Sequence, residues 1–378
     1  MPAPALSRTV VAEGAPRGGL AALCITQTTG WGVLYYSLIA AVRPISEDTG
    51  WDPALVTGAF SAGLLVSAAA GIAVGRRLDR TGPRALMIGG SLLGVLALAA
   101  VGLAPNLPAF FAAWLVAGTA QATVLYQPAF TVISRWYGRA RVRPLTVLTL
   151  VAGFASTIFA PLTAALISAF GWRGAFLILA GIMGIISVPL HARYLNRNWA
   201  PAAPGIPAPD HQVMVRAVRR SPEFLGLQAL MVLLCLGLYT VTLNIIPLLV
   251  EKGADYATAA LGLGLVGAGQ VGGRLLFAAI PSGARLQVIA GAVRGCQTLL
   301  QATIMADRWG TQNLGTLQGL FAAPLTAVTA VAPAAGPVLA AWLGTYTSMA
   351  YAMTAAAATA AILAAAGGIR RLRPSRIG

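Results

Sequence analysis

The chain has 378 residues, of which 57% are hydrophobic and only 10% are charged, and its mean hydropathy is +0.77. Soluble domains carry about 25% charged residues, so this composition excludes a water-facing globular surface and requires lipid around the folded chain. The net charge of +16 comes from arginines in short stretches between apolar runs, which favours anionic membrane lipid over nucleic acid as their partner.

Eleven apolar segments are long enough to cross a membrane as helices, which takes about 20 residues each. In chain order they are 19–42, 54–75, 85–104, 108–133, 145–169, 174–194, 224–249, 257–280, 286–306, 314–339 and 346–368. A proline- and arginine-rich linker at 195–222 separates six of these helices from five. We therefore predict an all-α polytopic membrane protein with an N-terminal six-helix half at 1–194 and a C-terminal five-helix half at 223–378.

Charge alternates between successive loops. Arginines follow the second, fourth and sixth predicted helices and form the C-terminal tail, whereas the loops between them carry acidic residues, Lys252 or no charge. By the positive-inside rule, this pattern predicts cytoplasmic termini in a multi-pass protein of the plasma membrane. The polar first 18 residues lack the apolar core of a signal peptide, so we expect the first helix to direct insertion.

Residues that could form a catalytic or metal site are scattered. Cys24, Cys235 and Cys296 lie within apolar stretches, which is typical of small buried side chains. His191 and His211 do not have the spacing of metal ligands, and no phosphate-binding Gly-Lys-Ser/Thr loop is present. We expect no enzyme activity, no metal and no cofactor.

An internal repeat relates the two halves. TVISRWYG at 131–138 is similar to TIMADRWG at 303–310, and FAPLTAAL at 159–166 is similar to VAPAAGPVL at 331–339. Two predicted helices lie between Arg84 and Arg135, but only one lies between Arg285 and Arg308, so the second half is expected to lack a counterpart of helix 85–104. Three interpretations stay open: helix 286–306 is re-entrant, the tail faces outward, or the chain is a deletion product of a twelve-helix ancestor.

The loop after the second helix carries a family resemblance. GRRLDRTGPR resembles the signature loop of the major facilitator superfamily, with matches at Gly75, Asp79, Arg80, Gly82 and Arg84 and departures at Arg77 and Pro83. The resemblance implies a secondary transporter that lacks its ninth helix, with this loop acting as a cytoplasmic latch. Asp79 is expected to accept hydrogen bonds from a helix N-terminus or to pair with an arginine. GWGVLYYSL at 30–38 resembles the first helix of monocarboxylate-type members.

Polar residues within apolar helices point to a substrate site. Arg294 shares a helix face with Gln297 and Gln301, and its guanidinium would bind a carboxylate through two hydrogen bonds. The remaining candidates are Gln121, Tyr126, Gln127, Tyr35, Tyr36 and Asn244, with Gln27, Trp31 and Tyr239 as further cavity residues.

These residues predict a monomeric secondary active transporter of a small solute, with an organic anion such as a monocarboxylate as the first choice. A coupling proton or ion would accompany the solute. Two alternatives are an efflux permease for an amphipathic compound and a transport-inactive membrane sensor or truncated paralogue.

Overall fold

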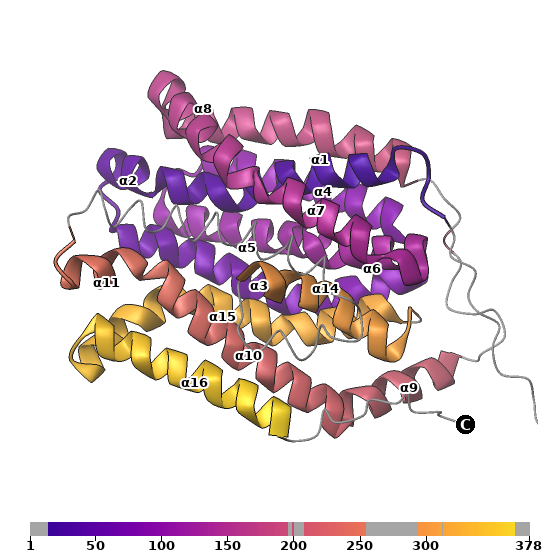
Figure 1. Ribbon diagram of the computed structural model, residues 1–378. Coiled ribbons are helices and arrows are strands. Elements are labelled where there is room, and N and C mark those ends of the chain that lie inside the picture. Colours follow the sequence, from indigo (N-terminus) through magenta and orange to yellow (C-terminus); the bar gives the residue numbers. More distant parts are fainter. Residues whose placement is uncertain (1–13, 196–198, 200–207, 255–293, 312, 367–378) are drawn as a thin grey trace, which may run out of the picture.

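The computed structural model describes residues 14–195, 199, 208–254, 294–311 and 313–366, and this part of the chain is helical without strands. The helices pack side by side in one bundle (Figure 1). The first part contains α1 (Gly19–Trp31), the π-helix η1 (Gly32–Tyr36), α2 (Ser37–Thr49), α3 (Pro53–Thr81), α4 (Pro83–Gly102), α5 (Leu107–Val124), α6 (Tyr126–Tyr137), the 3₁₀-helix η2 (Gly138–Ala140), α7 (Val142–Gly153) and α8 (Ala155–Tyr194). The second part contains α9 (Ala208–Arg220), α10 (Pro222–Leu243), α11 (Ile245–Glu251), α14 (Arg294–Trp309), α15 (Leu314–Leu343) and α16 (Tyr346–Ala366).

The all-helical, membrane-spanning fold class predicted from composition is confirmed. Six helical segments of the described chain are long and apolar enough to cross a membrane. Two of them, α3 and α4, correspond closely to the predicted helices 54–75 and 85–104. Asp52 caps α3 by accepting a hydrogen bond from the Ala54 amide, and a proline stands at the first position of both helices, where its missing N–H costs nothing.

Several predicted helices are interrupted or differently bounded. The first runs on to Thr49 and contains a π-helix, and the segment 108–133 breaks at Leu125, whose backbone is extended. The predicted helix 224–249 breaks at Asn244, and 145–169 breaks at Phe154. Conversely, α8 joins parts of two predicted helices across a kink at Gly171, which has a positive φ of 68°. Apolar patterning fixes where a span lies, but single residues decide where its backbone departs from the helix.

The structure describes part of the predicted linker, but not the region of the predicted missing helix. Residues 208–220, which the prediction left within a linker without structure, form α9, and this helix packs on α10 and α15. The predicted helix 257–280 and the first eight residues of 286–306 lie outside the described residues. The question of the missing ninth helix therefore falls outside the described part as well.

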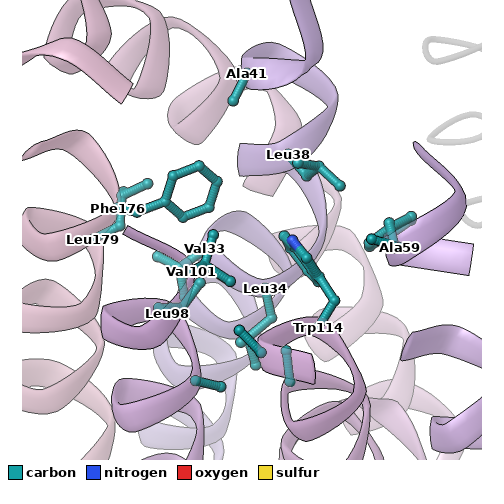
Figure 2. Packing of buried hydrophobic residues seen from close by; sticks show 14 of the residues in the cluster. Val33, Leu34, Leu38, Ala41, Ala59, Leu98, Val101, Trp114, Phe176 and Leu179 are labelled. Carbon is teal, nitrogen blue, oxygen red and sulfur yellow. The ribbon is translucent and has the colours of Figure 1, made fainter. Parts of the chain in front are cut away.

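Two clusters of buried apolar side chains form the core. One lies within the first part of the chain, between η1, α2, α3, α4, α5 and α8 (Figure 2). Among the described residues, Ala330 is its one buried member from the second part. The other joins the two parts: Phe130, Trp136 and Leu145 share it with Phe224 and Phe321. Its members come from α1, α4, α6 and α7 of the first part and from α9, α10, α14 and α15 of the second. The two parts of the chain therefore share one apolar cluster.

Candidate functional site

Asp79 binds the start of a helix from the other part of the chain. Its carboxylate accepts hydrogen bonds from the amides of Gly315 at 2.9 Å and Thr316 at 2.7 Å, and from the Thr316 hydroxyl at 2.7 Å. These groups begin α15, whose first amides have no partner within their own helix and whose dipole favours a negative charge there. Asp79 is buried, so the interaction is shielded from water. Of the two contacts expected for Asp79, the structure contains the one with a helix N-terminus.

Glycines allow α3 and α15 to cross at very short distance beside this contact. A Cβ atom at Gly75 would collide with the carbonyl oxygen of Gly315, and one at Gly319 would collide with the carbonyl oxygen of Gly71. Each helix thus has two glycines four residues apart, the spacing that brings membrane helices into backbone contact. The predicted signature residue Gly75 is therefore required at this crossing for its lack of a side chain.

Trp199, from the linker, covers the signature loop. Its ring packs against Gly82, which has a positive φ of 78°, and its indole N–H donates to the carbonyl oxygen of Asp79 at 3.4 Å. The guanidinium of Arg135 lies over the ring, 4.2 Å from its centroid. The other predicted signature residues, Arg80 and Arg84, are exposed on the same end of the bundle.

A second link between the two parts lies close by. Arg141, which is buried, forms an ion pair and hydrogen bond with Asp307 at the end of α14, and it also donates to the carbonyl oxygen of Gly138 at 2.7 Å. Neither Arg141 nor Trp199 is among the site residues predicted from the sequence. Arg141 is one of several loop arginines, and the sequence signal for Asp307 is its position inside the repeated segment.

Deeper in the bundle, two interrupted helices exchange glutamine hydrogen bonds. Gln27 of α1 donates to the carbonyl oxygen of Val124 at 2.5 Å, and Gln121 of α5 donates to the carbonyl oxygen of Leu34 at 2.7 Å. Val124 lacks its helical partner because residue 128 is proline, which has no N–H. Leu34 lies in the π-helix η1, where the regular hydrogen-bond pattern is altered. The predicted candidate Gln121 therefore stabilises the interruption in the first span.

Aromatic rings form a row beside these interruptions. Neighbouring centroids are 4.8–5.4 Å apart, in the order Phe130, Tyr126, Trp31, Tyr35, Phe60 and Trp114. Tyr35, Tyr126 and Trp31 are only partly buried although they lie well inside the bundle, and Tyr36 packs edge-on against Tyr35. The indole N–H of Trp31 is buried and has no partner among the described residues. The row thus offers polar groups and apolar ring faces together.

Gln127 extends this group toward α3. A Cβ atom at Gly71 would lie 2.8 Å from the Gln127 side-chain oxygen, and this oxygen is buried without a partner among the described residues. Tyr35, Tyr36, Gln121, Tyr126 and Gln127, all predicted from the sequence, are therefore brought together in one region of the first part.

The candidates in the second part make contacts within that part. Gln297 donates to the Cys235 sulfur at 3.0 Å, and Asn244 donates to the carbonyl oxygen of Thr240 at 2.9 Å and packs on Gly336. Gln301 is half-buried on the same helix as Gln297. Arg294 is the first residue of α14, and its side chain lies outside the described residues. No described contact joins Gln297 or Asn244 to the aromatic row.

Comparison with known proteins gives the family. The Major Facilitator Superfamily profile matches residues 21–286. The chain belongs to this superfamily. This membership confirms the resemblance carried by the signature loop, and it identifies the protein as a multi-pass membrane transporter rather than an enzyme.

One relative comes from the mouse. The chain is 30% identical over 138 residues to monocarboxylate transporter 11 of Mus musculus, and the match covers 36% of this chain and 29% of that protein. The chain thus matches less than a third of the length of this relative.

Solved structures show the same fold at low identity. The transporter FucP in its outward conformation has a TM-score of 0.70 at 13% identity, covering 92% of this chain and 97% of that one. The human organic anion transporter MFSD10 has a TM-score of 0.62 at 16% identity, covering 92% and 99%. The proton:xylose symporter XylE has a TM-score of 0.57 at 12% identity, covering 93% and 96%. These similarities establish the arrangement of the helices.

Proposed function

We propose that the protein is a secondary active transporter of a small organic anion, with a monocarboxylate as its substrate. The observation that carries this proposal is the group of partly exposed aromatic and amide side chains at the interrupted first and fourth spans. Interrupted helices free polar backbone groups within the membrane, where they commonly mark the substrate path. The similarity to a monocarboxylate transporter and to the fold of an organic anion transporter supports the choice of an anion.

Arg294 is the proposed partner of the substrate carboxylate. Among the candidate substrate residues it is the one with a positive charge, and a guanidinium holds a carboxylate through two parallel hydrogen bonds. The unpartnered indole N–H of Trp31 supplies a further donor on the opposite part of the chain. The tyrosines and the amides at Gln121 and Gln127 would complete the wall around the solute.

The proposed mechanism is alternating access by rocking of the two halves, 1–194 and 223–378, joined by the linker 195–222. The contacts of Asp79 and Arg141 would close the signature-loop end, which the loop arginines assign to the cytoplasm. Release of these contacts would open the site to that side. A proton or another ion is the proposed coupling partner.

Transport by purified protein in proteoliposomes tests the proposal. With a proton gradient, we expect saturable uptake of a labelled short-chain monocarboxylate, and Arg294→Gln is expected to lower it roughly 10- to 100-fold through loss of a charged hydrogen bond. Arg143→Gln is the matched control, since Arg143 is exposed. Folded protein without saturable flux of any carboxylate would favour the sensor. Flux of neutral amphipathic compounds alone would favour the efflux permease.

A further inference from the structure

A pocket of about 390 Å³ lies where α9, α10 and α15 meet, separate from the aromatic row. Its wall contains both charged and apolar side chains. Arg219 and Arg220, both exposed, come from the end of α9, whereas Leu225 comes from α10 and Leu320 from α15. The buried Phe224 also lines the pocket.

The position of the pocket relative to the bilayer follows from α10. This helix is one of the segments able to cross the membrane, and it begins at Pro222. The two arginines directly precede it, at the level of lipid headgroups. Leu225, 50% exposed, lies one turn inside the span, at the level where acyl chains begin. The pocket therefore combines a cationic headgroup region with an apolar wall.

The arginines are available for an external anion. Neither Arg219 nor Arg220 forms an ion pair with another described residue. Glu223, the acidic residue nearest in sequence, interacts electrostatically with Arg308. Gln228, which also lines the pocket, uses its amide N–H on the carbonyl oxygen of Leu320 at 2.8 Å. The pocket wall thus contains two positive charges, on Arg219 and Arg220, that no acidic side chain among the described residues pairs with.

The other half has a groove at the equivalent place. It lies between α1 and α7, has a volume of about 630 Å³, and is lined by Arg17, Leu20, Tyr137 and Val147 among others. The spacing that relates Arg135 to Arg308 also relates Val147 to Leu320. The groove itself therefore follows from the helix packing that both halves share. The second copy differs in having two adjacent arginines in its wall, where the first has Arg17.

We propose that the α9–α10–α15 pocket binds an anionic phospholipid from the leaflet at the signature-loop end. Arg219 and Arg220 bind the headgroup phosphate, and an acyl chain lies against Leu225 and Leu320. Basic pockets between helices at this depth recognise such headgroups. The lipid would hold α9 against the start of α10, and so anchor the linker whose Trp199 covers the signature loop.

Lipid binding to the purified full chain in detergent, followed by native mass spectrometry, tests this site. Wild type is expected to bind phosphatidylglycerol more tightly than phosphatidylcholine. The double variant Arg219→Gln/Arg220→Gln is expected to weaken the tightest phosphatidylglycerol binding roughly 30-fold, because each arginine near an anionic surface contributes about 1 kcal/mol. Arg216→Gln removes the same charge from α9 outside the pocket and should leave the affinity within about twofold.

Three results would overturn the proposal. The double variant could bind phosphatidylglycerol as wild type does, wild type could bind both lipids equally, or glycerol phosphate without acyl chains could compete as well as the lipid does. Should the double variant fail to fold, the single variant Arg219→Gln replaces it in the test. Its affinity for phosphatidylglycerol is expected to be about fivefold lower than that of wild type. Leu225→Gln provides an independent readout, since it should weaken long-chain lipid more than short-chain lipid.

Discussion

Glutamine side chains repair backbone hydrogen bonding where proline has removed an amide. Gln228 of α10 donates to the carbonyl oxygen of Leu320, four residues before Pro324 in α15. Gln27 does the same for Val124, four residues before Pro128. In the apolar interior no water is available to pair with a freed carbonyl, so an amide from a neighbouring helix stabilises both the bend and the helix contact.

A double-mutant cycle tests this pairing. Gln228→Leu is expected to destabilise the protein by about 1 kcal/mol, because it leaves the Leu320 carbonyl without a partner. Pro324→Ala restores an amide at residue 324, so in that background Gln228→Leu should cost less than half as much. Reversible unfolding in detergent measures the four free energies. Equal costs in both backgrounds would show that Gln228 does not compensate for the proline.

Ionisation of Asp48 makes a pH-dependent contribution at the end opposite the signature loop. Hydrogen bonds from the Trp172 indole and from Arg173 lower the pKa of Asp48. Because the folded-state pKa lies below the unfolded value, the stabilisation is present above about pH 4 and disappears as the pH falls through the folded pKa.

Comparing Asp48→Asn with wild type measures this contribution. The melting temperature of the variant should be lower at pH 7, and the difference should shrink at pH 3. Glu47→Gln removes a neighbouring charge that pairs with Arg43 on its own helix, and serves as the control. A difference that stays constant with pH would contradict the assignment.

At the scale of elements, the crossing of α3 and α15 determines how closely the two parts approach. These two helices make the most extensive contact between the two parts, and the contact depends on glycines at 71, 75, 315 and 319. Asp79 then binds the start of α15 one turn beyond Gly75. Both features therefore stabilise the contact between α3 and α15. The glycines allow the two backbones to approach closely, and the Asp79 carboxylate adds charged hydrogen bonds.

Gly75→Val should separate α3 from α15, since a side chain at 75 meets backbone rather than a flexible neighbour. We expect a loss of stability of about 2 kcal/mol or more and a larger distance between spin labels on the two parts at the signature-loop end. Gly89→Val is the matched control, because a Cβ atom at Gly89 meets nothing within 4 Å. Unchanged spin-label distances in Gly75→Val would contradict close packing of α3 against α15 at this glycine.

At the scale of the whole molecule, the polar contacts described at the two ends of the helix bundle join different parts of the chain. At the signature-loop end, Asp79 and Arg141 link one part of the chain to the other. At the opposite end, Asp48 binds α8 within the first part, and Glu251 accepts hydrogen bonds from the Tyr346 and Thr347 amides within the second. Such an arrangement is consistent with the proposed mechanism, in which each part stays together while the signature-loop end opens.

Cross-linking across the signature-loop end tests whether that end must open. In a background with the native cysteines replaced by serine, a bifunctional thiol reagent with a reducible linker should join the thiols of Arg141→Cys/Asp307→Cys, because the arginine side chain that now spans the gap is longer than a disulfide allows. The cross-link should abolish transport until it is reduced. Arg43→Cys/Glu47→Cys, within a single helix, should cross-link without loss of transport. Full transport with the first pair cross-linked would exclude movement at this end.

The sequence by itself determined the membrane environment, most of the described spans and the family. Each of these depends on patterns that survive without a folded chain: the apolar runs of α3 and α4, the alternation of basic loops, and the spacing from Gly75 to Arg84. The sequence also predicted Tyr35, Gln121 and Tyr126 as candidate substrate-site residues, because polar side chains are rare in apolar helices.

Only the tertiary structure decided which groups meet. The pairings of Asp79 with α15, of Arg141 with Asp307 and of Gln27 with Val124 join residues about 100 or more positions apart. No local pattern encodes such pairs, because they depend on how helices cross. The break at Leu125 is stabilised in the same way, since the Gln27 amide of another helix pairs with the carbonyl oxygen of Val124. At Asn244 the partner is local, because the Asn244 side chain donates to the carbonyl oxygen of Thr240 in its own helix.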